Sequence, residues 1–172
     1  MHQLHLLRHA KSSWDDDAVD HKRPLTRRGR EAARLISETL PAAIGALDLV
    51  LCSTALRARE TAELALAGYK PQPKILYEDG LYLATPEALI RRLRQLDEAC
   101  GAVMVVGHNP GLHELATTLA DPGSSGFSNL ANGKFPTGVR ARFAIGTGWA
   151  GIDSARHRLV DYVTVKSLGG TD

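Results

Sequence analysis

The chain has 172 residues, 44% hydrophobic and 23% charged, which is typical of a water-soluble globular domain. Its formal net charge is only +2 at pH 7, so charge gives no argument for a nucleic-acid or membrane partner. The two cysteines, Cys52 and Cys100, lack the spacing of a metal site or a disulfide framework. No apolar stretch approaches the roughly 18 residues of a membrane span, and a strand pattern begins by Leu4. We therefore expect one cytoplasmic domain over residues 1–172.

Apolar runs alternate with helical apolar stripes along most of the chain. Strands are predicted at 4–7, 47–52, 74–77 and 102–106, and the stripes predict helices around 32–40, 55–66, 86–96 and 110–119. Thr85-Pro86 is typical of a helix start, with an N-cap followed by proline, and Asn109-Pro110 resembles another. This alternation predicts an α/β fold with a largely parallel sheet.

The last third of the chain departs from this pattern. Residues 121–138 contain four glycines and two prolines, which favours a long functional loop rather than a domain boundary. Residues 139–145 and 159–165 have β character on either side of a glycine-rich turn at 146–151.

Arginines and histidines follow three of the predicted strands. Arg8 and His9 close the first strand, Arg57 comes shortly after the second, and His108 ends the strand at 102–106. Ligands of open α/β sheets bind beyond the carboxyl ends of the strands, where these side chains would meet. Arginine forks match phosphate oxygens, and a neutral histidine can attack phosphorus near pH 7. The sequence thus predicts an anion pocket in which a histidine could accept a phosphoryl group.

Four segments, in this order, resemble motifs of the histidine phosphatase (phosphoglycerate mutase-like) superfamily. They are Leu7-Arg8-His9-Ala10-Lys11-Ser12, with alanine at the glycine of an Arg-His-Gly signature; Leu25-Thr26-Arg27-Arg28-Gly29-Arg30-Glu31-Ala32; Ser53 through Thr61; and Gly107-His108-Asn109-Pro110-Gly111. The short chain, Arg23-Pro24-Leu25 and Lys134-Phe135-Pro136-Thr137 are similar to the SixA-like phosphohistidine phosphatase branch. The resemblance implies a three-layer α/β/α sandwich with a mostly parallel central sheet.

The resemblance also implies roles for individual residues. His9 would be the nucleophile and become transiently phosphorylated, and water would then hydrolyse the phosphohistidine. The groups expected to bind the phosphoryl oxygens are Arg8, Arg57, His108 and the hydroxyl of Ser12. Glu78 or its neighbour Asp79 could protonate the leaving group, or either could be a solvated loop carboxylate. No cofactor and no metal are expected.

The substrate stays open between alternatives. The leading hypothesis is a phosphatase acting on phosphohistidine in a partner protein, because an imidazole can leave with its own proton and needs little help from an enzymic acid. A small-molecule phosphomonoesterase would use the same chemistry. A phosphate- or phosphopeptide-binding module without turnover belongs to a different class, and a mutase would need covering elements for which the chain is too short. The oligomeric state is also left open.

Overall fold

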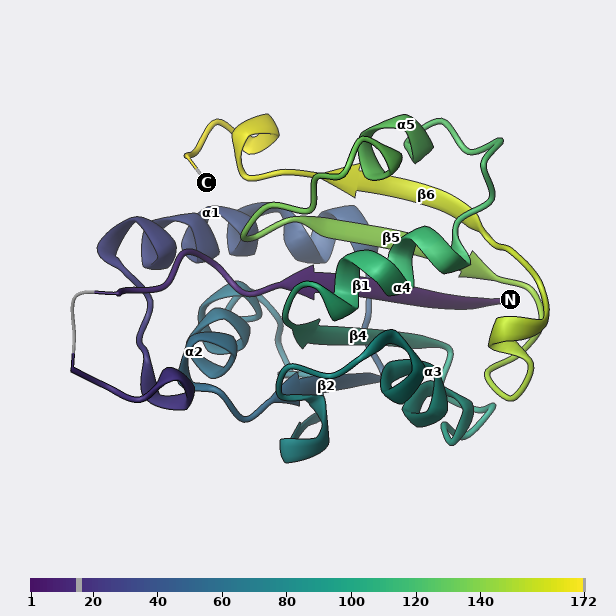
Figure 1. The fold of residues 1–172 in the computed structure, drawn as a ribbon, viewed down its shortest axis with the longest axis horizontal. Helices are drawn as coiled ribbons and strands as arrows, with labels where there is room; N and C mark the ends of the chain where they lie inside the picture. The colour runs from purple at the N-terminus through teal and green to yellow at the C-terminus, as the bar shows by residue number, and fades with distance from the viewer. Residues whose placement is uncertain (15–16, 172) are drawn as a thin grey trace.

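A six-stranded mixed sheet runs through the middle of the molecule in the computed structural model, which describes residues 1–14 and 17–171 (Figure 1). The strands are β1 (His2–Arg8), β2 (Leu49–Ser53), β3 (Ile75–Glu78), β4 (Ala102–Gly107), β5 (Arg140–Ile145) and β6 (Arg158–Val163), in the order β3-β2-β4-β1-β5-β6. The first four pair in parallel, whereas β5 is antiparallel to both β1 and β6. The predicted α/β fold with a mostly parallel sheet is confirmed.

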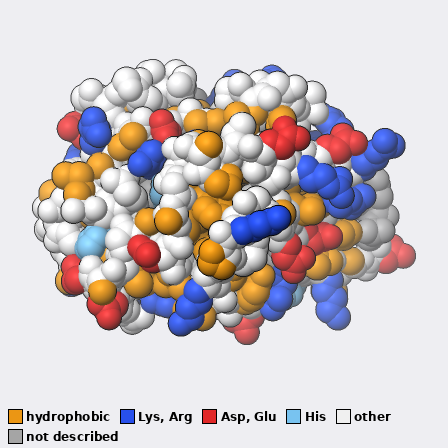
Figure 2. All heavy atoms as spheres, turned by 180° about the vertical axis from the view of Figure 1, so that it is seen from behind, with side chains coloured by type: hydrophobic (Ala, Val, Ile, Leu, Met, Phe, Trp, Pro, Cys, Tyr) orange, Lys and Arg blue, Asp and Glu red, His pale blue; other side chains and the backbone are white. Residues whose placement is uncertain are grey.

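Helices cover both faces of this sheet, as the resemblance implied. α1 (Arg27–Ile44) and α2 (Leu56–Ala65) lie behind the sheet in Figure 1, and α3 (Pro86–Arg94), α4 (Gly111–Leu119) and the short α5 (Phe127–Ala131) lie on the other side. Hydrophobic, acidic and basic side chains are intermingled on the surface seen from behind (Figure 2). No helix in the described part of the chain is both long enough and apolar enough to cross a bilayer.

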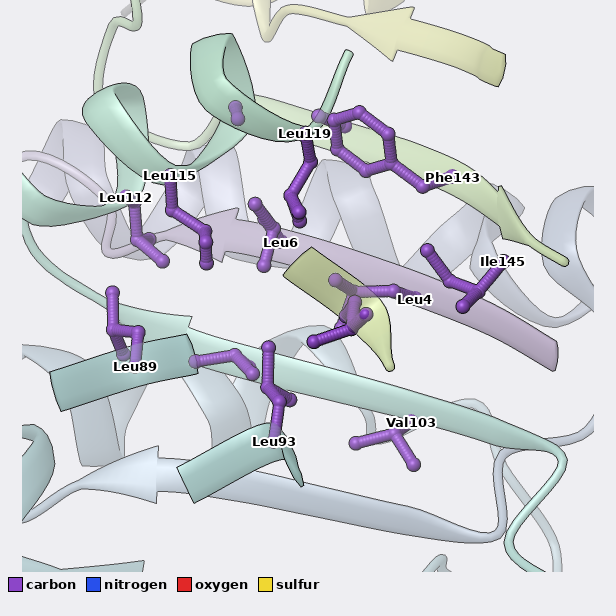
Figure 3. Close-up of a cluster of buried hydrophobic side chains, with 14 of the residues drawn as sticks. Leu4, Leu6, Leu89, Leu93, Val103, Leu112, Leu115, Leu119, Phe143 and Ile145 are labelled. Atoms are coloured by element: carbon purple, nitrogen blue, oxygen red, sulfur yellow. The ribbon is translucent and has the colours of Figure 1, made fainter. Parts of the chain in front are cut away.

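Alternating side chains on the strands supply the two halves of the core. On β1, Leu4 and Leu6 point to one face of the sheet and Leu7 to the other, in keeping with the two-residue period of a strand. On the first of these faces they meet leucines of α3 and α4, including Leu93 and Leu115 (Figure 3). The sandwich therefore holds the carboxyl ends of β1, β2 and β4 at one rigid edge.

The start of α1 presses on the loop that follows β1. Thr26 caps this helix by accepting the backbone N–H of Gly29 at 3.0 Å. A Cβ atom at Gly29 would lie 2.1 Å from the carbonyl oxygen of Lys11, so a larger residue cannot occupy this position without moving the backbone. The glycine thus lets α1 support the segment that carries His9.

Two local expectations need correction. The stretch 121–138 is not loop throughout, because it contains α5, whose Leu130 is fully buried in the core. α4 begins at Gly111 without a side-chain cap, because Pro110 rather than Asn109 occupies the N-cap position. The Asn109 side-chain NH2 donates to the Phe135 carbonyl at 2.9 Å, and its Oδ1 accepts no hydrogen bond from the described residues. The start of α3 is as predicted, with Thr85 accepting from the Ala88 backbone and Pro86 in the first turn.

Candidate active site

A cavity of about 350 Å³ opens at the carboxyl ends of β1 and β4. Its walls include five residues that the sequence singled out, Arg8, His9, Ser12, Arg57 and His108. They come from the ends of two strands, the loop after β1 and the first turn of α2. The parallel pairing of β1, β4 and β2 is what brings these distant segments together.

His9 is held in one orientation by its own backbone neighbour. Its Nδ1 lies 2.7 Å from the carbonyl oxygen of Ala10, which can only accept, so Nδ1 carries the proton and Nε2 keeps its lone pair. The side chain is buried, and burial lowers the pKa of His9 to about 3, with the charges of His108, Arg8 and Arg57 acting in the same direction. His9 is therefore a neutral imidazole at pH 7 with a free Nε2.

His108 faces His9 across the cavity, with 5.3 Å between the ring centroids. Its Nε2 lies 2.7 Å from the Ser53 hydroxyl, which already accepts the Ala55 N–H at 3.2 Å. The Ser53 hydroxyl can donate to Nε2 or accept from it, and the other ring nitrogen of His108, Nδ1, is buried and has no protein partner among the described residues. Burial and the nearby Arg57 lower the pKa of His108 to about 4.

The two predicted arginines are anchored by backbone carbonyls. Arg8 donates to the Phe135 carbonyl at 3.0 Å, and Arg57 donates to the Asp20 carbonyl at 2.7 Å. Both guanidinium groups line the cavity, and burial together with the charge of Arg57 lowers the pKa of Arg8. Two fixed guanidinium groups beside two neutral histidines form a strong site for a tetrahedral anion.

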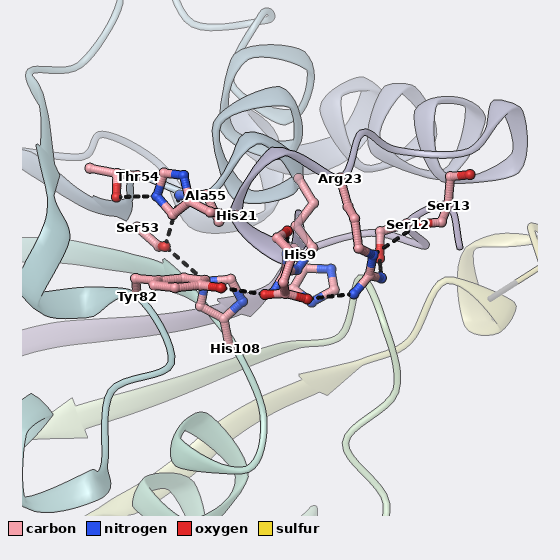
Figure 4. A network of polar contacts seen from close by, with 12 residues as sticks. His9, Ser12, Ser13, His21, Arg23, Ser53, Thr54, Ala55, Tyr82 and His108 are labelled. Carbon is pink, nitrogen blue, oxygen red and sulfur yellow. Dashed lines mark hydrogen bonds and ion pairs between the residues drawn. The ribbon is translucent and has the colours of Figure 1, made fainter. Parts of the chain in front are cut away.

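Asp20 joins this group, although it was not among the residues predicted from the sequence. Its carboxylate accepts hydrogen bonds from Arg57 at 3.0 Å, from Arg23 at 2.8 Å and from the Tyr82 hydroxyl (Figure 4). The Tyr82 hydrogen bond, with those of Arg57 and Arg23, lowers the pKa of Asp20 to about 2, so it is an anion at neutral pH. The one available signal was its position three residues before Arg23, which begins a segment that resembles the SixA-like branch.

Ser12 lies on the cavity wall next to Arg23. The Arg23 guanidinium donates to the Ser12 hydroxyl and, through Nε, to the Ser13 carbonyl at 2.9 Å. Because its oxygen accepts from Arg23, the Ser12 hydroxyl can direct its own proton into the cavity.

Glu78 is not brought to the cavity, which differs from the expectation. Both of its carboxylate oxygens accept from Arg92 of α3, at 2.8 and 2.9 Å, because β3 is the edge strand and its end faces that helix. Asp79 instead accepts the hydroxyl of Thr54 at 2.6 Å, and neither carboxylate lines the cavity. Within the described ranges, no three His, Cys, Asp or Glu side chains gather in a way that could hold a metal ion.

The fold and this site define an α/β enzyme with paired histidines and arginines around an anion pocket, and comparisons with known proteins agree. The model of the histidine phosphatase superfamily (branch 1) matches residues 4–81. An uncharacterized protein of Mycobacterium tuberculosis is 35% identical over 158 residues, covering 91% of this chain and 98% of that protein.

Solved structures give the same assignment over nearly the whole chain. A structure described as a proposed phosphohistidine phosphatase SixA from Nakamurella multipartitia matches with a TM-score of 0.81 and 29% identity, covering 95% of each chain. A similarly described protein from Agrobacterium tumefaciens matches with a TM-score of 0.79 and 27% identity, covering 95% of this chain and 97% of that one. The chain belongs to the histidine phosphatase superfamily, in its SixA-like branch, and is a phosphatase.

Proposed function

We propose that the chain hydrolyses phosphohistidine in a partner protein, with His9 as the nucleophile. The observation that carries the proposal is the 2.7 Å hydrogen bond from His9 Nδ1–H to the Ala10 carbonyl. It leaves Nε2 unprotonated inside a cavity that also holds Arg8, Arg57 and His108. A nucleophile with a fixed tautomer beside cationic donors is what phosphoryl transfer requires.

The reaction proceeds in two steps. In the first, His9 Nε2 forms a bond to phosphorus and the phosphorus–nitrogen bond of the substrate breaks. The substrate imidazole, already protonated on its other ring nitrogen, leaves as neutral imidazole and keeps the electron pair of the broken bond. In the second, water attacks the phosphorus, the bond to Nε2 breaks, and inorganic phosphate and neutral His9 are regenerated. Arg8, Arg57 and His108, which line the cavity, bind the phosphoryl oxygens in both steps, with the Ser12 hydroxyl beside them.

The carboxylates near the site support a substrate with a good leaving group. Asp20 is ionised and bound to two arginines, and both oxygens of Glu78 accept from Arg92. Both groups are therefore occupied as hydrogen-bond acceptors rather than proton donors. An alkoxide leaving group would need a proton from the enzyme, whereas a protonated imidazole leaves readily, so phosphohistidine suits this site better than a small phosphate ester. The cytoplasmic location stays a prediction of the sequence.

The test is to incubate the chain with a histidine-phosphorylated protein and measure both phosphate release and acid-labile, base-stable label on the chain. We expect both from the unsubstituted protein and neither from His9→Ala. The matched control is His2→Ala, which removes a histidine from the opposite end of the same strand. Label or turnover in His9→Ala would contradict the assignment, and a preference above 100-fold for small phosphate esters would favour the phosphomonoesterase alternative.

A further inference from the structure

Large hydrophobic side chains are exposed in the cavity wall and one residue away from it along the chain. Apart from the terminal Met1, the large hydrophobic side chains exposed in the described part of the chain are Trp14, Val19, Leu56 and Leu83. Trp14 and Leu83 line the cavity itself, whereas Val19 and Leu56 immediately precede two of its lining residues, Asp20 and Arg57. We call these four residues the apolar rim. Exposed apolar side chains gathered in one place mark interaction surfaces more often than isolated ones do.

Trp14 is held at the cavity while most of its surface stays exposed. The guanidinium carbon of Arg23 lies 3.4 Å from the centroid of the Trp14 ring, within the range of a cation–π contact. The side chain is nevertheless 78% exposed. An indole that is anchored on one face and open elsewhere is positioned to contact a second molecule.

Leu83 is strained as well as exposed. Its φ of 49° lies in the left-handed region and makes it the one non-glycine residue of the described chain with a positive φ. This conformation costs of the order of 1 kcal/mol or more for a bulky residue, and a half-exposed side chain gains little core packing in return. Strain of this kind is found mostly at ligand-binding positions.

We propose that the apolar rim is the docking surface for the histidine-phosphorylated protein, an inference that rests on the proposed function. The phosphoryl anion binds in the cationic cavity and therefore lies at the centre of the partner's contact face. The apolar rim then contacts apolar side chains that surround the phosphohistidine on the partner. A small phosphate ester enclosed in 350 Å³ would leave Val19 and Leu56 without a contact, because they lie outside the cavity lining. A protein surface, in contrast, extends beyond the cavity toward the chain neighbours of its lining, Val19 and Leu56.

The test compares kcat/KM on a histidine-phosphorylated protein with kcat/KM on free phosphohistidine. We expect the ratio of the two to fall at least tenfold in Val19→Ser/Leu56→Ser and in Trp14→Ser/Leu83→Ser. Lys70→Ser, at an exposed position beyond α2, is the control and should keep the ratio within twofold. A ratio within twofold of the unsubstituted protein in both double variants would overturn the proposal.

A second measurement does not depend on turnover. His9→Ala, mixed with the histidine-phosphorylated protein, should show a blue shift of tryptophan emission, because docking buries Trp14 while Trp149 is already fully buried. An unshifted emission spectrum at a saturating concentration of the partner protein overturns the proposal that the apolar rim is the docking surface. If the unsubstituted protein hydrolyses free phosphohistidine but not the histidine-phosphorylated protein, the rim and the protein substrate are both overturned, and the His9 chemistry stands. If it hydrolyses neither, the whole proposed function is overturned, and the rim with it.

Discussion

Asp20 and Arg57 are in direct contact at the cavity, with 3.0 Å between the carboxylate Oδ2 and the guanidinium Nη2. The Asp20 carbonyl accepts the other guanidinium nitrogen of Arg57 at 2.7 Å, so one residue fixes the whole fork. The arginine that we propose to bind the phosphoryl group is thus held by a carboxylate of the protein itself. This contact gives Asp20 two opposing effects on a bound phosphoryl group, since it orients Arg57 and also repels negative charge.

Asp20→Asn separates these two effects. The amide keeps the shape and one acceptor oxygen but removes the charge, so we expect inorganic phosphate to bind about three- to tenfold more tightly, a modest figure because the Asp20 side chain is 42% exposed. The less firmly held Arg57 should lower kcat at the same time. Product-inhibition kinetics measure both quantities. Asp79→Asn is the control, and weaker phosphate binding in Asp20→Asn would show that orientation dominates over charge.

Glu78→Gln tests whether this carboxylate is a general acid. Because its two oxygens accept from Arg92, we expect kcat on a histidine-phosphorylated protein to fall less than tenfold. The free energy of unfolding should fall by up to about 1 kcal/mol, as for a partly exposed ion pair. Steady-state rates and urea denaturation check the two values. A loss of 100-fold or more in kcat with unchanged folding would restore Glu78 to a catalytic role.

Thr61 links α2 to the loop that carries His9, the proposed nucleophile. Its hydroxyl accepts the Ala10 N–H at 2.9 Å and donates to the Arg57 carbonyl at 2.7 Å, in a fully buried position. Thr61→Val leaves the Ala10 N–H without a partner, so the free energy of unfolding should fall by about 1–3 kcal/mol and kcat should fall with it. Thr61→Ser retains the hydroxyl and should recover most of kcat. Equal kinetic losses in both variants would assign the effect to packing.

His5 makes the fold sensitive to acid. It is fully buried on β1, neither ring nitrogen has a partner in the described part of the chain, and burial with Arg140 and Arg142 nearby lowers its pKa to about 3. Below pH 6.5 His5 is protonated in the unfolded chain, whereas in the folded chain it stays neutral down to about pH 3. The free energy of unfolding therefore falls with pH in this window, by about 1.4 kcal/mol per pH unit from this histidine.

His5→Leu removes that contribution and two buried unpaired nitrogens. We expect urea denaturation at pH 7, 6, 5 and 4 to show that the free energy of unfolding of the variant falls less steeply with decreasing pH, by about 1.4 kcal/mol per pH unit. At pH 7 the variant should be more stable by roughly 1–3 kcal/mol. Parallel curves for the two proteins would show that His5 takes up its proton in the folded state.

The elements nearest the chemistry were predictable because their positions are set by local sequence. Arg8, His9 and His108 each follow an apolar run, and the end of a parallel strand determines the sheet edge at which its next residues lie. Thr85-Pro86 and the stripes at 3.6-residue spacing likewise report on their own helices. The glycines of residues 121–138 indicated a loop, so the short helix α5 was not predicted. This helix depends on the core contacts of Leu130.

The sequence alone thus determined the layered α/β architecture, the strand ends that carry arginine and histidine, and the family to which they point. Only the tertiary structure decided which carboxylate meets those cations. Asp20 reaches Arg57 and Tyr82 across 37 and 62 residues of chain, and Glu78 turns to Arg92 because β3 lies at the sheet edge beside α3. Such pairings follow from how the elements pack, and no local spacing encodes them.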